Sequence, residues 1–201
     1  FVPAGPVTVT HLLQDAGSGA VFGWYNANPD VLSPARFPIF PYCIGGSTPK
    51  PSNVTVDWLV DPNYAGGEVG LYLDVYGASN CGGASRDVFY SEEWRNNDAG
   101  GGAAFVHLIK YQSQTAGCRY YLAWEDLRTG GDNDFNDYDF HVDGVAAACG
   151  LGPDGVPGVC PAGSSCMGGV CAQAICKIGG ECPEGSICDP LCGGCIDVCG
   201  D

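Results

Sequence analysis

The stretch CRYYLAWEDLRTGGDNDFNDYDFHV, residues 118–142, contains two alternating segments on either side of an acidic loop. In residues 118–124 and 137–142 an apolar or aromatic side chain occupies every second position, which is the period of a β-strand with one buried face. The two segments therefore predict a pair of strands in which Tyr138, Phe140 and Val142 face inward.

The same period recurs along the first 148 residues, between loops rich in Gly, Pro, Asn and Ser. Further strands are predicted at 7–13, 20–25, 54–60, 68–76, 87–90 and 103–111. One face of residues 54–60 should carry Val54, Val56, Trp58 and Val60. The inward face of residues 68–76 should carry Val69, Leu71, Leu73 and Val75, and the opposite face Glu68, Tyr72, Asp74 and Tyr76. No segment shows a helical period, so residues 1–148 predict an all-β, jelly-roll-like β-sandwich.

A second unit is expected from Cys149 onward. Ten of the 13 cysteines lie in residues 149–201, and GVCPAGSSC (158–166) recurs as GECPEGSIC (180–188), 22 residues later. Such a segment buries too little apolar area to fold without cross-links. It predicts a small disulfide-rich C-terminal tail of two short repeats. The cysteines of this tail are Cys149, Cys160, Cys166, Cys171, Cys176, Cys182, Cys188, Cys192, Cys195 and Cys199.

The remaining cysteines are Cys43, Cys81 and Cys118. We expect two of them to pair and the third to bond to the tail, although connectivity does not follow from sequence. Because 13 is odd, at least one cysteine lacks an intrachain partner. An intermolecular disulfide is the favoured interpretation, and a free buried thiol is the alternative. The CGGC at 192–195 is read as part of the disulfide scaffold rather than as a redox pair, because no βαβ unit surrounds it.

Charge and cysteine content limit the classes of partner and compartment. The net charge is −15 with only 8 Lys and Arg, which argues against nucleic acid and anionic membranes as partners. The cysteine density indicates an oxidising, extracellular compartment. The chain begins at Phe1 without a signal-like segment, so we expect a processed, secreted chain. No apolar run is long enough to span a bilayer.

The acidic loop is the candidate for binding chemistry. Residues 124–144 contain seven acidic side chains and a single basic one, Arg128. Carboxylates this close repel one another unless a cation neutralises them. Ca²⁺ takes six to eight oxygen ligands, and the candidate ligands are Glu125, Asp126, Asp132, Asp134, Asn136 and Asp137.

The loop begins like an EF-hand, D-x-D-x-N, but Asp137 stands where that loop needs Gly, so an EF-hand is excluded. Mg²⁺ and Zn²⁺ fit the ligand set less well. The alternative is a solvated acidic turn without an ion.

These residues carry a resemblance to a known family. YLAWEDL followed by GGDNDFNDYDFHV is similar to the signature of an uncharacterised bacterial domain family that occurs in secreted proteins and calcium-dependent adhesins. VFGWYN (21–26) resembles a strand of the same family. The resemblance spans roughly residues 20–145. It implies a β-sandwich with bound Ca²⁺ and metal-ligand roles for Glu125, Asp126, Asp132, Asp134 and Asp137, and it implies no enzymatic activity. The cysteine-rich tail is not part of the pattern.

Signals of catalysis are few. His11, His107 and His141 are expected on separate strands, GxSxG is absent, and Glu92 and Glu93 should point to opposite faces of a strand. We therefore expect no enzyme. The aromatic residues expected at the surface could stack on sugar rings or could simply pack within the sheets; they are Tyr72, Tyr76, Trp94, Tyr120 and Tyr121. Asn53, in NVT, is a possible glycosylation acceptor.

Two functional hypotheses follow from different classes. The first is a secreted, Ca²⁺-stabilised structural subunit of an extracellular assembly, such as a surface filament, sheath or matrix. In that hypothesis the chain self-associates through an intermolecular disulfide, or through the extended N-terminus FVPAGPVTVT donated to a neighbour's sheet. The alternative is a calcium-dependent carbohydrate-binding or adhesin module.

Overall fold

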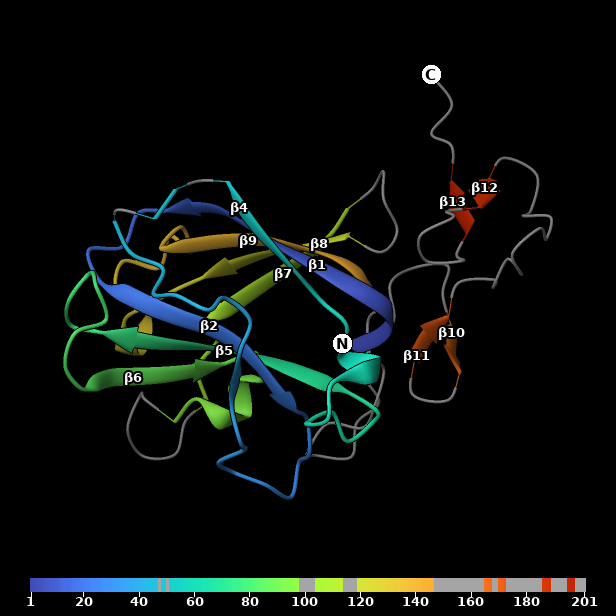
Figure 1. Cartoon of the computed structure of the whole chain (residues 1–201), viewed down its shortest axis with the longest axis horizontal. Helices are drawn as coiled ribbons and strands as arrows, with labels where there is room; N and C mark the ends of the chain where they lie inside the picture. Colours follow the sequence, from blue (N-terminus) through green and yellow to red (C-terminus); the bar gives the residue numbers. More distant parts are fainter. Residues whose placement is uncertain are drawn as a thin grey trace.

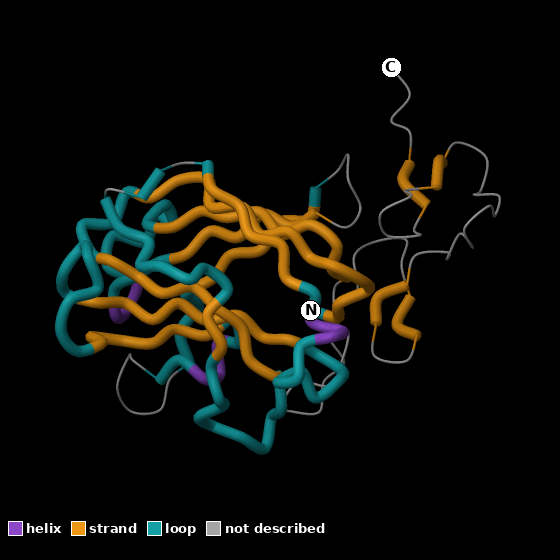
Figure 2. The backbone as a smooth tube through the Cα atoms, viewed as in Figure 1, coloured by secondary structure: helices purple, strands orange, loops and turns teal. Residues whose placement is uncertain are grey.

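The computed structural model is a sandwich of two antiparallel β-sheets (Figures 1 and 2). It describes residues 1–46, 48–49, 51–97, 104–113 and 119–146, and four short strands beyond them, 165–167, 170–172, 186–188 and 195–197. The helical elements among these residues are three-residue 3₁₀ turns. The predicted all-β sandwich is confirmed. The described residues contain no helix long and apolar enough to cross a membrane.

The larger sheet has the strand order β4-β1-β9-β8-β7. Its strands are β1 (Val2–Gln14), β4 (Ser52–Val56), β7 (Leu108–Gln112), β8 (Arg119–Trp124) and β9 (Tyr138–Ala146). In the register of β8 and β9, Leu122 lies opposite Phe140 and Trp124 opposite Tyr138. This pairing is the hairpin that the alternation in residues 118–142 predicts.

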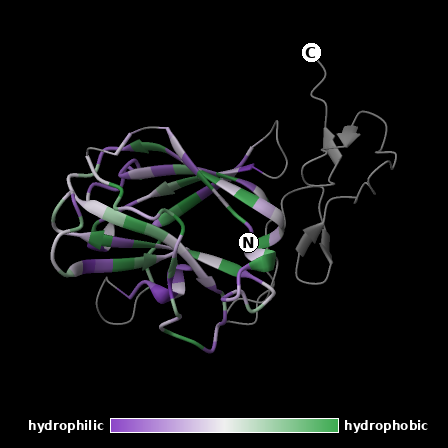
Figure 3. Cartoon of the chain, in the orientation of Figure 1, coloured by the Kyte–Doolittle hydropathy of each residue, from purple (hydrophilic) through white to green (hydrophobic). Residues whose placement is uncertain are grey.

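The smaller sheet has the order β3-β2-β5-β6. Its strands are β2 (Gly19–Asn26), β3 (Phe37–Pro38), β5 (Val69–Tyr76) and β6 (Ser85–Tyr90). The core lies between the two sheets, and Figure 3 shows hydrophobic residues alternating with polar ones along their strands. Phe22 of β2 stacks on Phe140 of β9 with ring centroids 4.1 Å apart, so the two layers are in direct contact. Tyr138, Phe140 and Val142 are fully buried, as predicted.

Two strand predictions need correction. The strand expected at 54–60 ends at Val56 and is followed by the 3₁₀ turn η1 (Trp58–Val60), which Asp57 caps by accepting a hydrogen bond from the Leu59 N–H. The turn buries Trp58 but leaves Val60 77% exposed, so Val60 does not share the inward face. The strand expected at 103–111 begins only at Leu108. β3 has two residues and was not predicted.

The alternation in β5 predicts that its outer face is exposed, but this face is covered. Tyr72 and Asp74 are buried, at 3% and 8% exposure. Arg36, just before β3, places its guanidinium 5.5 Å from the centre of the Tyr72 ring and bonds the Asp74 carboxylate at 2.9 Å. A connection between strands therefore covers this face, which a period of two along one strand does not reveal.

The N-terminal segment is an inner strand of its own sheet. Residues 7–11 of β1 pair with β4 on one side, and β1 pairs with β9 on the other, with a register shift between Pro3 and Thr8. Phe1 also exchanges hydrogen bonds with Val69 at the start of β5, which links the two sheets. The segment expected as a strand donor to a neighbour is therefore already paired within the chain.

The described cysteines include one disulfide, Cys43–Cys81, with Cα atoms 5.8 Å apart. Cys118 and the boundary expected at residues 148 and 149 lie outside the described residues. In the tail, β10 (Ser165–Met167) pairs with β11 (Val170–Ala172), and β12 (Ser186–Cys188) with β13 (Cys195–Asp197). Cys166 and Cys188, which end the two predicted repeats, thus each lie in the first strand of a hairpin. Cys171 of β11 and Cys195 of β13 are their partners in the strand register. The remaining tail cysteines lie outside the described residues.

Candidate metal centre

The acidic cluster is built by the connection between β8 and β9, at the end of the sandwich where the β1–β2 and β5–β6 connections also lie (Figure 1). Because Trp124 pairs with Tyr138 as the last rung of the ladder, the next residues outward, Glu125 and Asp137, lie on either side of the hairpin mouth. The register that buries the aromatic residues of β9 thus also brings these two carboxylates together.

The loop between them turns through a run of residues with positive φ. Gly130 and Gly131 have φ values of 80° and 46°, and Asn133 and Phe135 have 59° and 53°. The left-handed residues 133 and 135 alternate with Asp132, Asp134 and Asn136. Asn133 N–H donates to the Gly130 carbonyl at 2.5 Å, which closes the turn. The GG pair and the D-x-D spacing therefore shape one tight acidic turn.

Glu125 is the buried centre of the cluster. Its exposure is 0%, and neither carboxylate oxygen has a hydrogen-bond partner of normal geometry. Burial, followed by the charge of Asp137, raises the pKa of Glu125 from 4.5 to about 7. An ionised carboxylate buried without a partner is costly. Buried carboxylate oxygens of this kind are suitable ligands for a cation that binds oxygen.

Asp126, in contrast, has partners within the protein. Its Oδ2 accepts a hydrogen bond from Ser18 Oγ, and its Oδ1 lies 3.6 Å from Nη2 of Arg86. The same Nη2 donates to the Asp126 carbonyl at 2.7 Å, and the Asp126 N–H donates to Oδ2 of Asp137 at 2.8 Å. Burial also raises the pKa of Asp137. Asp126 therefore anchors the cluster to β6 and to the β1–β2 connection.

The carboxylates fall into two groups whose ligand atoms lie within 4.8 Å of one another. The first group is Glu125, Asp132 and Asp134, of which the two aspartates are exposed. The second is Glu125, Asp126 and Asp137, of which Asp126 is buried and Asp137 is half-buried. Both groups could hold a metal ion. Five of the six ligands suggested by the sequence thus converge, and Glu125 belongs to both groups.

The sixth residue, Asn136, lies beside the cluster. Its Nδ2 donates to Oδ2 of Asp134 at 2.9 Å, and its backbone N–H lies 3.3 Å from Oδ1 of the same aspartate. In this arrangement Asn136 orients Asp134. Arg128, the one basic residue of the loop, turns away and pairs with Asp87 at 2.5 Å.

Three residues that support the site were not predicted: Ser18, Arg86 and His107. His107 Nδ1 donates to the Glu125 carbonyl, and the Glu125 N–H donates to the His107 carbonyl, both at 3.0 Å. The His107 ring stacks on Phe89 at 3.8 Å. These residues are distant in sequence and carry no motif, although the need to neutralise part of the cluster could have directed attention to Arg86.

The other residues considered from sequence are mostly structural. Tyr72 and Tyr120 are buried, at 3% and 6% exposure, so they do not form a sugar platform; Tyr121 is 40% exposed. Asn53 is exposed on β4. His11 and His107 are buried, and His141 lies 3.3 Å from Asp143.

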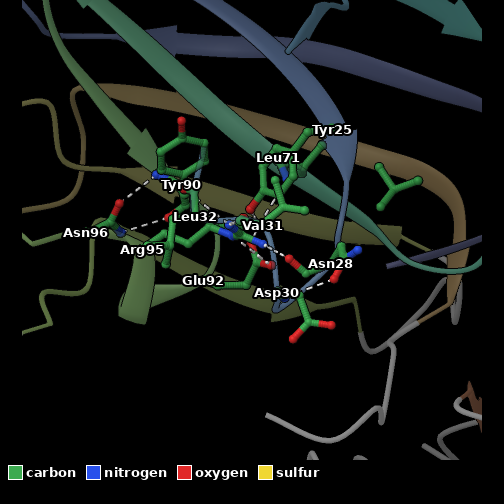
Figure 4. A network of polar contacts seen from close by, with 12 residues as sticks. Tyr25, Asn28, Asp30, Val31, Leu32, Leu71, Tyr90, Glu92, Arg95 and Asn96 are labelled. Carbon is green, nitrogen blue, oxygen red and sulfur yellow. Dashed lines mark hydrogen bonds and ion pairs between the residues drawn. The ribbon is translucent and has the colours of Figure 1, made fainter. Parts of the chain in front are cut away.

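Glu92 and Glu93 are not on a strand, because η2 (Glu93–Arg95) begins there. Glu92 pairs with Arg95 at 3.3 Å, in the polar network of Figure 4, and burial raises its pKa. Glu93 is exposed. The two carboxylates thus have different surroundings, as expected, but they do not lie on opposite faces of a strand.

Residues 64–145 match a domain family of unknown function, DUF4114. The matched range begins before β5 and includes β8, the acidic loop and nearly all of β9. It covers the C-terminal part of the resemblance expected over roughly residues 20–145, and it is in keeping with an uncharacterised family. Searches of curated proteins and of solved structures found no match.

Proposed function

We propose that this chain is a secreted structural module whose β-sandwich is stabilised by Ca²⁺ and whose covalent cross-links suit it to an extracellular assembly such as a filament, sheath or matrix. The observation that carries the calcium part is Glu125, a fully buried carboxylate at the centre of converging aspartates, neither of whose oxygens has a hydrogen-bond partner of normal geometry. An oxygen-only ligand set with no histidine or cysteine favours Ca²⁺ over Zn²⁺.

The position of the cluster supports a stabilising role. The Asp137 carbonyl accepts hydrogen bonds from the Asp15 and Ala16 N–H groups at 3.1 and 3.4 Å, and Tyr138 OH donates to the Ser18 carbonyl at 2.8 Å. Arg86 reaches the cluster from the smaller sheet. An ion at Glu125 would therefore hold together connections from both sheets at one end of the sandwich.

The extracellular part of the proposal rests on the Cys43–Cys81 disulfide and the cysteine-rich tail. Such bonds persist in oxidising compartments. The net charge of −15 suits a calcium-containing medium. We expect no catalytic activity, and we expect self-association through a disulfide rather than through the N-terminal strand, since residues 8–11 of β1 are already paired on both sides.

Thermal unfolding tests the calcium proposal. A ligand that binds only the folded state stabilises it by about 2.7 kcal/mol at one hundred times its Kd. For a chain of this length that corresponds to a rise in Tm of about 5–10 °C with Ca²⁺ over EDTA. Asp134→Ala should remove most of the rise. The matched control is Asp30→Ala, which removes the same charge from an exposed loop between β2 and β3. Equal Tm values with Ca²⁺ and EDTA would refute the proposal.

One observation favours carbohydrate binding as a second candidate. Tyr111 on β7 and Tyr121 on β8 lie directly opposite each other and are 58% and 40% exposed. His141 on β9 continues this row, opposite Tyr121. Exposed aromatic rings in a row on a flat sheet suit stacking on sugar rings. Glycan-array binding that is lost in Tyr111→Ala would support this candidate, and the absence of binding to any glycan would remove it.

A further inference from the structure

We propose that the acidic hairpin holds two divalent cations, not one, and that the carboxylate of Glu125 bridges them. This inference rests on the calcium-binding function proposed above and adds a second metal position to it. The two positions are named here the outer position, with Asp132 and Asp134, and the inner position, with Asp126 and Asp137.

The grouping of the ligand atoms is the first argument. Oxygen ligands lie about 2.3–2.6 Å from Ca²⁺, so two ligands on opposite sides of one ion are about 5 Å apart. Within each group the ligand atoms lie within 4.8 Å of one another, which is the spacing that one ion can fill. The five carboxylates form two such groups that share Glu125, rather than one group of five. A single ion at ordinary distances therefore uses one group and leaves the other.

The surroundings of Glu125 also favour two ions. Both of its oxygens are buried, and both are without a hydrogen-bond partner of normal geometry. One ion bound through one oxygen would leave the other buried and unsatisfied, which carries a desolvation penalty. Oε1 lies against Gly131, the residue before Asp132, because a Cβ added there would come within 2.8 Å of it. A bridge with one oxygen on each ion satisfies both atoms.

The balance of charge is the third argument. The five carboxylates of the two groups carry five negative charges when they are ionised. Arg86 and Arg128 both pair with Asp87, and Arg86 also lies beside Asp126, so the two arginines together offset Asp87 and one of the five charges. Two divalent cations neutralise the remaining four charges, whereas one cation leaves two uncompensated beside a buried glutamate. Carboxylates held this close together repel one another unless a cation lies between them.

The two positions differ in their surroundings. Asp132 and Asp134 of the outer position are exposed, so its ion keeps water ligands and exchanges freely. Asp126 of the inner position is 4% exposed and is already held by Ser18 and Arg86. We therefore expect two distinguishable sites rather than a pair of equivalent ones.

Calcium stoichiometry tests the proposal directly on the full disulfide-bonded chain. Equilibrium dialysis with ⁴⁵Ca²⁺ at pH 8 should give two ions for the unaltered protein. The double variant Asp132→Asn, Asp134→Asn should retain one ion, and Asp137→Asn should retain one. Glu125→Gln should lose tight binding of both. The control Asp30→Asn should retain two.

Each result separates this inference from the proposed function. One ion in the unaltered protein overturns the two-cation proposal but leaves calcium stabilisation intact, whereas no ion overturns both. A double variant that loses every ion, or none, also overturns the bridge. Where a variant does not fold, Tb³⁺ bound to the unaltered protein gives an independent reading. Two luminescence lifetimes, the shorter from the hydrated outer position, are expected, and a single lifetime at saturation contradicts the proposal.

Discussion

Glu125 owes its position to the strand that precedes it and its chemistry to the loop that follows. Trp124, at the end of β8, is fully buried against the core, and its neighbour Glu125 is buried with it. Its backbone is fixed by two hydrogen bonds to His107, so the side chain has little freedom to turn towards solvent. The residue therefore needs a proton or a cation to compensate its charge.

The proton alternative gives a pH prediction for the calcium-free protein. Burial, followed by the charge of Asp137, raises the pKa of Glu125 from 4.5 to about 7, so without a bound cation the folded state binds more protons than the unfolded chain between these values. The free energy of unfolding should therefore fall as pH rises from about 4.5 to about 7. Urea denaturation from pH 5 to 8 measures this slope, which should be smaller in Glu125→Gln. With saturating Ca²⁺ above pH 7 the ion replaces the proton, and the lost stability should return. A calcium-free protein that gains stability from pH 5 to 7 would contradict the assignment.

Gly131 gives a second prediction for a single residue. Its φ of +46° disfavours side chains, and an added Cβ would lie 2.8 Å from both Oε1 of Glu125 and Cδ1 of Leu127. Gly131→Ala should lower stability by about 1–3 kcal/mol and weaken calcium binding about tenfold, equivalent to about 1.4 kcal/mol. Gly77→Ala, where a Cβ meets nothing within 4 Å, is the matched control. Titration calorimetry that finds equal calcium affinities for the two variants would count against the close approach of Glu125.

At the scale of elements, alternation predicted the long strands but not their ends. The β8–β9 hairpin and its inward residues followed from the sequence, because a period of two with large apolar side chains is buried on one face only. Trp58, in contrast, is buried from a 3₁₀ turn, so burial continued after the strand ended. The predicted ligands converge because they share one hairpin. Ser18 and Arg86 reach the same place from other connections, and no local pattern encodes that contact.

The connection after β2 shows how one side chain can fix an irregular element. The side chain of Arg95 is buried, and its Nη2 donates to the Asn28 carbonyl at 2.7 Å, while its Nη1 donates to the Val31 carbonyl (Figure 4). The guanidinium also lies 4.1 Å from the Trp94 ring centre and 5.2 Å from that of Tyr25. It therefore ties residues 28–32 to the outer side of the smaller sheet.

Replacing that planar group should release the connection. A lysine cannot supply the several directed donors, so Arg95→Lys should cost about 2–4 kcal/mol and expose residues 28–36 to limited proteolysis. Arg119→Lys is the matched control, because Arg119 makes a half-exposed pair with Asp143 and should cost less than about 1 kcal/mol. Similar losses in the two variants, measured by urea denaturation, would mean that Arg95 acts only as a surface charge.

At the scale of the whole molecule, the sandwich has two different kinds of reinforcement. The acidic hairpin joins connections from both sheets at one end, through Arg86 of β6 and Ser18 before β2. The Cys43–Cys81 disulfide joins the connections that follow β3 and β5. The two devices should respond to different agents, because under the proposed calcium binding EDTA weakens the first and a reductant breaks the second. Their effects on unfolding can therefore be measured separately.

The cysteine count gives the last prediction, which concerns the assembled protein. Thirteen cysteines cannot all pair within one chain, and the secreted function proposed above exposes the remaining thiol to an oxidising medium. We expect native material to migrate as a covalent oligomer on non-reducing gels and as a monomer after reduction. Intact-mass measurement after alkylation without reduction should find no adduct on the oligomer. A monomer carrying one adduct would show a free thiol, and the covalent assembly would then be excluded, while calcium stabilisation would be unaffected.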